Sequence, residues 1–82
     1  RYSQVRNSAG VTGAQAARRV LDSQGLYDVG IEMTPGELSD HYDPRKRTLF
    51  LSQGVYSQPT IAAAAIAAHE AGHAIQHAKG YA

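Results

Sequence analysis

The stretch covering residues 61–79 constrains the fold more than any other part of the sequence. It contains no proline and one glycine, Gly72, and it is rich in alanine, the residue with the highest helix propensity. Thr60 is a favourable N-cap directly before the stretch, Pro59 suits a helix start, and Gly80 is a natural helix terminator. The sequence therefore predicts one long C-terminal helix.

Before this helix, the sequence predicts a shorter helix and a small sheet. Thr12 and Gln15 have the spacing of a capping box, and apolar residues recur at helical spacing after them. Turn signals at residues 34–36 and 43–46 separate short apolar runs that predict strands, and the last two strands pair as a hairpin. The expected elements are a helix over residues 12–24, strands over residues 26–33, 38–42 and 47–52, and the long helix.

The fold class that follows is α+β, with an N-terminal helix, a small three-stranded sheet containing a hairpin, and a long C-terminal helix. In the first strand, Tyr27, Val29 and Ile31 are expected to share one face. Residues 1–10 show no periodicity and predict an extended or frayed lead-in. The alanine-rich residues 62–68 predict a surface for close helix packing.

Composition indicates a small globular protein and excludes several functions. The 82 residues suffice for one domain, and 43% hydrophobic residues are too many for a disordered chain. A formal net charge of +1 gives no electrostatic basis for binding nucleic acid or anionic lipid. The absence of cysteine excludes thiolate metal sites. The longest apolar run, residues 61–68, is far shorter than the about 20 residues of a membrane helix, so we expect the chain itself to be soluble.

The predicted long helix carries the H-E-x-x-H pattern as His69-Glu70-Ala71-Gly72-His73. Residues four apart on a helix differ by about 40° in azimuth and about 6 Å in rise, so both imidazoles can bind one tetrahedral zinc ion. Glu70 directly follows the first ligand and can accept a proton from the water that zinc activates for attack on a carbonyl. We therefore predict a zinc site with His69 and His73 as ligands and Glu70 as the general base.

Two further histidines are weaker candidates for the same ion. His77 continues the spacing of His69 and His73, but an unbroken helix places it about 12 Å along the axis from His69. The alternative for His77 is a solvent-facing histidine that the dipole at the helix C-terminus favours. His41 precedes a predicted turn, where a polar surface histidine is the alternative to a ligand or substrate contact. The basic residues 45–47 are typical of a solvated hairpin tip, so nucleic-acid binding is not expected there.

Several motifs are collinear with those of one known family. They are Thr12-Gly13-Ala14, Ala17-Arg18, Leu21-Asp22, Gly25-Leu26, Asp40-His41-Tyr42-Asp43-Pro44, Leu49-Phe50-Leu51-Ser52, Val55-Tyr56 and Ala67-Ala68-His69-Glu70-Ala71-Gly72-His73-Ala74-Ile75-Gln76. On these residues, which cover nearly the whole chain, the sequence resembles the YugP-type neutral zinc metallopeptidases. The resemblance implies a bacterial-type membrane protein with hydrophobic helices before and after this region. A chain that begins at Arg1 rather than Met agrees with a piece of such a protein.

The resemblance also implies a zincin-like catalytic domain of the gluzincin type, whose third zinc ligand is a glutamate on a later helix. No acidic residue follows Glu70, so we expect the third ligand to lie outside residues 1–82. An oxyanion-stabilising tyrosine or histidine is expected further on as well, and Tyr56 or His41 could replace it only by their position. One strand is implied to be the sheet edge that receives an extended peptide substrate as an added strand. The residues of this strand are Thr48, Leu49, Phe50, Leu51 and Ser52.

We therefore expect residues 1–82 to be a single domain, the N-terminal zinc-binding part of the catalytic domain of a multi-pass membrane metallopeptidase. The flanking membrane helices and the segment with the third ligand are expected outside it. The expected cofactor is Zn2+, and the expected partners are a peptide or protein substrate and, for the fragment, further copies of itself. Two alternatives remain open: a non-catalytic zinc-binding or interaction module that uses His69 and His73, and a structural domain without metal.

Overall fold

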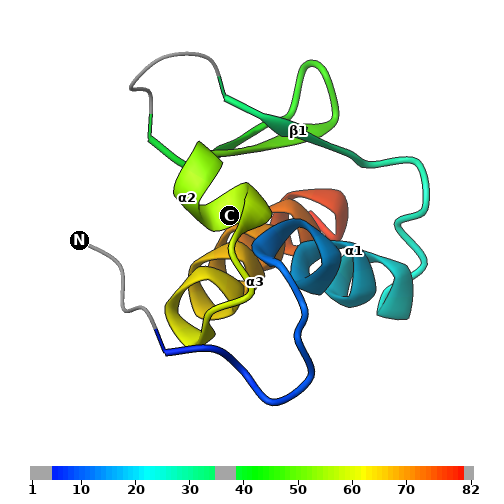
Figure 1. Ribbon diagram of the computed structural model, residues 1–82. Helices are drawn as coiled ribbons and strands as arrows, with labels where there is room; N and C mark the ends of the chain where they lie inside the picture. The colour runs from blue at the N-terminus through cyan, green and yellow to red at the C-terminus, as the bar shows by residue number, and fades with distance from the viewer. Residues whose placement is uncertain (1–4, 35–38, 81–82) are drawn as a thin grey trace.

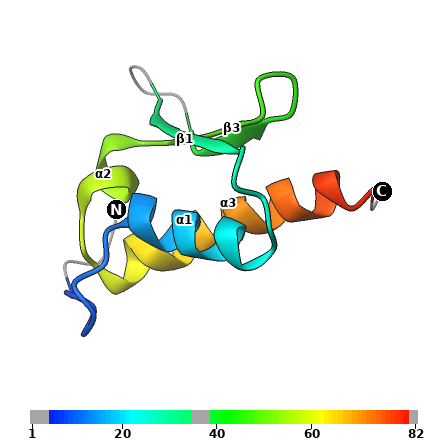
Figure 2. The same cartoon turned by 90° about the vertical axis from the view of Figure 1, so that its right-hand side faces the viewer.

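The sheet and the two longer helices form separate layers in the computed structural model of the protein, which describes residues 5–34 and 39–80 (Figure 1). Along the chain, the elements are α1 (Gly13–Ser23), β1 (Gly30–Met33), β2 (His41–Asp43), β3 (Thr48–Leu51), α2 (Gln53–Ser57) and α3 (Ile61–Ala78). Figure 2 shows α1 and α3 side by side on one side of the sheet. The predicted α+β class is confirmed, including its long C-terminal helix.

Both predicted helices form, and both have the predicted caps. The Thr12 hydroxyl accepts a hydrogen bond from the Gln15 amide, and the Gln15 side chain accepts one from the Thr12 amide. These two bonds complete the capping box. At the start of α3, the Thr60 hydroxyl accepts from the Ala63 amide. Gly80 follows the helix with a φ of 76°, in the left-handed region that commonly ends helices.

The alanine-rich face of α3 packs against α1. From α1, Ala17 and Leu21 are fully buried in the core that this contact forms. Because alanine projects only a methyl group, the two helix backbones can approach closely, as the alanine run predicted. The fully buried alanines of α3 are Ala63, Ala67, Ala71 and Ala74.

The short helix α2, which the sequence did not predict, lies against the start of α1. A Cβ at Gly13 would lie 1.9 Å from the carbonyl oxygen of Val55, so this approach requires a glycine. Val55 itself is fully buried. Because α2 has five residues and includes Gly54, neither apolar periodicity nor helix propensity could indicate it.

The central strand of the sheet is β3, in the order β1-β3-β2. It pairs in parallel with β1 and antiparallel with β2, which confirms the predicted hairpin. Leu49 and Leu51 are fully buried in the core beneath the sheet, whereas Phe50 is less buried and lies on the other face. Since strands lie on both sides of β3, the expectation that it forms the substrate-receiving sheet edge is wrong. The residues to which that expectation applied are Thr48, Leu49, Phe50, Leu51 and Ser52.

The turn of the β2–β3 hairpin forms where it was predicted. The carboxylate of Asp43 accepts hydrogen bonds from the backbone amides of Arg45 and Lys46, which stabilises the turn locally. β2 begins at His41, later than predicted. The other predicted turn falls mostly on residues 35–38, which lie outside the described residues.

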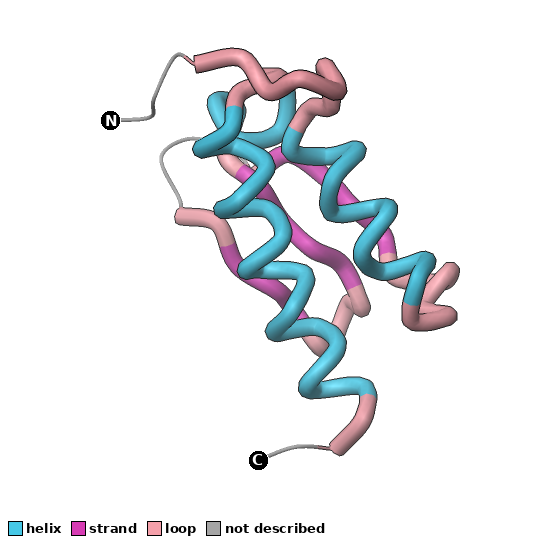
Figure 3. The backbone as a smooth tube through the Cα atoms, turned by 90° about the horizontal axis from the view of Figure 1, so that it is seen from below, coloured by secondary structure: helices cyan, strands magenta, loops and turns pink. Residues whose placement is uncertain are grey.

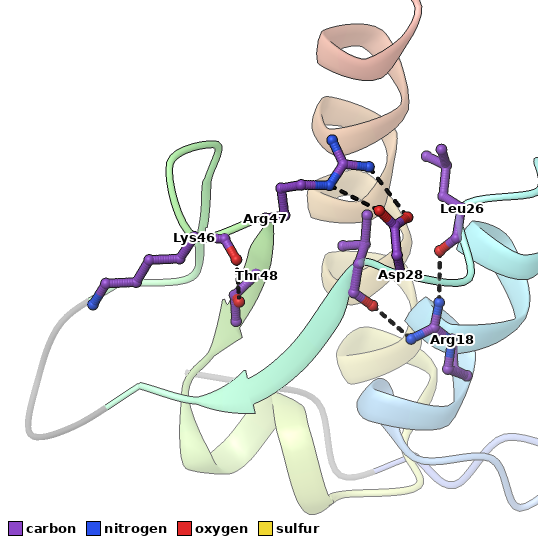
Figure 4. A network of polar contacts seen from close by, with 7 residues as sticks. Arg18, Leu26, Asp28, Lys46, Arg47 and Thr48 are labelled. Atoms are coloured by element: carbon purple, nitrogen blue, oxygen red, sulfur yellow. Dashed lines mark hydrogen bonds and ion pairs between the residues drawn. The ribbon is translucent and has the colours of Figure 1, made fainter.

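The first strand is shorter than predicted because an arginine of α1 binds the carbonyl oxygens before it. The Arg18 guanidinium donates to the carbonyl oxygen of Leu26 at 2.8 Å and to that of Val29 at 2.6 Å (Figure 4). These carbonyl oxygens thus accept hydrogen bonds from a side chain and not from a neighbouring strand, and β1 starts at Gly30. Tyr27 is 73% exposed, so the expectation that it shares the buried face of Val29 is wrong.

The described part of the N-terminal lead-in is attached to the start of α3 and is not frayed. The Asn7 side chain donates to the carbonyl oxygens of Val11 and Thr60, and the Asn7 amide donates to the Pro59 carbonyl oxygen at 2.9 Å. A side chain that bonds to residues far along the chain leaves no periodic signal. Periodicity therefore could not indicate this order.

Candidate metal centre

Three side chains on two adjacent turns of α3 form a group suited to a metal ion. Candidate ligand atoms of His69, Glu70 and His73 all lie within 4.8 Å of one another. The two imidazole rings have centroids 4.6 Å apart in an edge-to-face arrangement. The helical period alone explains this grouping, because residues three and four apart lie on one helix face.

The group is open to solvent on one side and borders the protein interior on the other. His69 is exposed, and the side chain of His73 is 51% exposed. The side chain of Glu70 is only 15% exposed, and its Oε1 lies 3.3 Å from Nδ1 of His73. The arrangement therefore gives an ion access to two imidazoles and keeps a mostly buried carboxylate beside them.

The donor atoms fit zinc. Imidazole nitrogens bind zinc at about 2.0–2.1 Å, and a histidine pair four residues apart on a helix is a recurrent zinc-binding arrangement. His69 and His73 are therefore the residues that could hold the ion, with Glu70 next to it. A tetrahedral ion would keep two further positions for water, substrate or another protein ligand.

The structure does not bring the other candidate histidines into this group. The His77 ring contacts Tyr42, with centroids 5.9 Å apart, near the exposed end of α3. The His41 ring stacks on Phe50, and its Nδ1 lies 2.8 Å from the Ser39 carbonyl oxygen. Because neighbours in a strand alternate and Tyr42 faces α3, His41 points away from α3. His41 is thus not in position to bind the same ion, and both histidines fit the surface alternative.

Of the two sheet edges, the one formed by β2 lies beside α3, the helix that carries the metal group. β2 packs against α3, whereas β1 packs against α1 and α2. The contact of Tyr42 with His77 brings β2 to the helix face that carries His73 one turn earlier. In Figure 3, the sheet lies behind the two long helices, with β2 on the side of α3. Sequence reasoning did not find this edge, since hairpin signals do not specify which strand is central.

Tyr56, the other candidate for oxyanion stabilisation, lies on α2 and is partly buried against the hydrophobic core. In residues 5–34 and 39–80, no helix is both long and apolar enough to cross a lipid bilayer.

A histidine pair and a glutamate on a long helix, packed beneath a small sheet, form a candidate metal-binding unit with the H-E-x-x-H pattern. The family model described as "Putative neutral zinc metallopeptidase" matches residues 1–82, so the chain belongs to this family. It is 52% identical over 81 residues, 99% of its length, to "Putative membrane protease YugP" of Bacillus subtilis (strain 168). The chain spans 36% of the length of that relative. No solved structure matches it significantly.

Proposed function

We propose that the chain is the zinc-binding part of the catalytic domain of a membrane-bound metallopeptidase that hydrolyses peptide bonds. The observation that carries this proposal is the grouping of His69, Glu70 and His73 on α3, in a chain that belongs to a zinc metallopeptidase family. The name of the relative, a membrane protease, supports a membrane-bound protein of which this chain is a part.

In this proposal, His69 and His73 hold the zinc ion through their imidazole nitrogens. When bound there, zinc would polarise a carbonyl group and lower the pKa of a water molecule. Glu70 accepts the proton of the attacking water and passes it to the leaving amine. Its position supports this role, because the carboxylate lies beside the ligands and is mostly shielded from solvent. A further protein ligand, the glutamate that the gluzincin type implies, is proposed to come from outside residues 1–82.

We place the peptide substrate along β2, as an added strand at that sheet edge. Within the described residues, no strand pairs with the outer side of β2. Main-chain pairing at an open edge binds extended peptides with little dependence on their sequence. The contact between β2 and α3 supports this placement, since it holds the edge next to the metal group.

The test measures zinc content and the hydrolysis of unfolded β-casein for three variants. Each variant is made both in this chain and in the longer protein that we propose. Glu70→Gln is expected to keep zinc and lose hydrolysis, and His69→Ala is expected to lose both. Gln76→Ala is the matched control, because it removes an exposed polar side chain of the same helix that lies outside the metal group. Unchanged hydrolysis by Glu70→Gln would contradict the proposal, and zinc binding without any hydrolysis in the longer protein would favour the non-catalytic module.

A further inference from the structure

We propose that Asp40 is a positioning residue, which fixes the edge strand β2 beside the metal group so that β2 can receive the substrate. The inference rests on the proposed function, because it concerns how the substrate of that same site is held. It assigns a role to a residue that contacts neither the metal group nor, in this proposal, the substrate.

The side chain of Asp40 links the start of β2 to the end of β3. Its Oδ1 accepts a hydrogen bond from the Ser52 backbone amide at 2.6 Å, in a half-buried position. Asp40 directly precedes β2, and Ser52 directly follows β3. The bond therefore lies just beyond the pair His41–Phe50, the last pair of the short β2–β3 ladder at this end. A carboxylate acceptor makes this a charge-assisted bond, stronger than an ordinary ladder bond.

The position of Ser52 is itself fixed, because this residue is the N-cap of α2. Its carbonyl oxygen accepts from the amides of Val55 at 3.1 Å and Tyr56 at 2.7 Å. α2 is fixed in turn by the fully buried Val55 and by its close approach to Gly13 of α1. Through Ser52, the Asp40 carboxylate thus ties the start of β2 to the packed part of the molecule.

Within residues 5–34 and 39–80, the other end of β2 shows no equivalent hydrogen bond to a distant part of the fold. The Asp43 carboxylate also accepts backbone amides, those of Arg45 and Lys46, but these belong to its own exposed turn. The bond of Asp40 instead connects residues twelve apart in sequence. Asp43 therefore shapes the turn, while Asp40 adds a hydrogen bond that links the start of β2 to a distant part of the fold.

A strand that forms only three pairs with its neighbour needs a further hydrogen bond of this kind to fix its position if it is to bind a substrate. An edge that moves must be ordered when the substrate binds, and the cost of ordering weakens affinity. A fixed β2 avoids this cost and keeps its backbone at a constant distance from α3. Loss of the tie is therefore expected to weaken substrate binding and to leave zinc binding intact.

The experiment measures the affinity of fluorescein-labelled, unfolded β-casein for the zinc-loaded chain by fluorescence anisotropy, in a Glu70→Gln background that prevents hydrolysis. Asp40→Ala is expected to weaken binding roughly tenfold, the factor that corresponds to one hydrogen bond to a charged group. Asp40→Asn keeps an acceptor oxygen in the same place and is expected to restore most of the affinity. Asp40→Glu keeps the acceptor but shifts it by one methylene, so binding is expected to weaken again.

Thr12→Ala is the matched control for stability. It removes the cap of α1 and destabilises the chain without touching β2. Its affinity for β-casein is expected to be unchanged, and zinc content is expected to be normal in every variant. Hydrogen exchange at the Ser52 amide is expected to accelerate in Asp40→Ala and to return towards the native rate in Asp40→Asn.

Four results would overturn the inference: no binding with native Asp40, unchanged affinity in Asp40→Ala, equal weakening in Thr12→Ala, or no restoration by Asp40→Asn. If Asp40→Ala does not fold, the affinities of Asp40→Asn and Asp40→Glu for β-casein are compared instead. Equal affinities of these two variants would contradict the inference. Failure of the proposed function is separate, because it shows as hydrolysis that survives Glu70→Gln.

Discussion

The Cβ position of Gly13 lies 1.9 Å from the carbonyl oxygen of Val55, so the backbones of α1 and α2 meet with no room for a side chain. This contact holds α2 against the helices, and α2 in turn receives the tie from Asp40 through Ser52. A clash with a backbone oxygen cannot be relieved by rotating a side chain. The whole α1–α2 junction must shift instead.

Gly13→Ala is therefore expected to lower the free energy of unfolding by about 1–3 kcal/mol, as for other overpacked sites, when measured by urea denaturation. Gly72→Ala is the matched control, because nothing lies within 4 Å of a Cβ at Gly72. There the change is expected to stabilise by about 0.5–1 kcal/mol, the gain of alanine over glycine within a helix. Equal effects of the two substitutions would contradict the close approach.

Arg18→Met is expected to destabilise the chain by about 1–3 kcal/mol, because it removes the guanidinium donor of two part-buried carbonyl oxygens. These oxygens belong to Leu26 and Val29, and Val29 is only 1% exposed. Arg19→Met is the control, since the neighbouring arginine is exposed and substitution there is expected to stay within about 0.5 kcal/mol. Chemical denaturation of both variants measures the difference, and a similar cost for Arg19→Met would count against the role of Arg18.

Zinc is expected to raise the melting temperature of the metal-stripped chain through the histidines of α3. An ion that binds only the folded state stabilises it by about 2.7 kcal/mol at a hundredfold excess over Kd. Calorimetric scans with and without zinc are expected to show this gain in the native chain and in His77→Ala, and to show none in His69→Ala. A zinc effect that persists in His69→Ala would place the ion elsewhere.

The sequence predicted those features that depend on neighbours along the chain. The capping box of Thr12 with Gln15 is a contact between residues three apart, and the same is true of Thr60 with Ala63. The grouping of His69 with His73 needs only the period of a helix. The metal group could thus be located from the pattern once the helix itself was predicted.

Features that depend on distant residues were missed. Hairpin signals identify β2 and β3 as partners but do not show that β1 adds in parallel to the far side of β3, which makes β3 central. The tie from Asp40 to Ser52 and the binding of two loop carbonyls by Arg18 leave no periodic trace either. The role of sheet edge was therefore assigned to the central strand, while the predicted strand pairing was correct.

The exposed ion pair of Asp28 with Arg47 is expected to make the stability of the fold depend on pH in the acid range (Figure 4). The hydrogen bonds that the Arg47 guanidinium donates lower the pKa of the Asp28 carboxyl below its ordinary value. The folded chain therefore binds this proton less tightly than the unfolded chain. The resulting stabilisation is fully present above the ordinary aspartate pKa of about 4 and is lost as pH falls through the lower folded-state value.

Asp28→Asn removes this contribution, so its stability is expected to fall below that of the native chain at pH 6. The difference is expected to narrow as pH decreases below about 4, and to be small at high salt, because both side chains are exposed. Urea denaturation of the two proteins between about pH 2 and about pH 6, a range that brackets the titration of aspartate, measures this difference. A difference that stays constant across this range would show that the pair stabilises the fold by packing and not by charge.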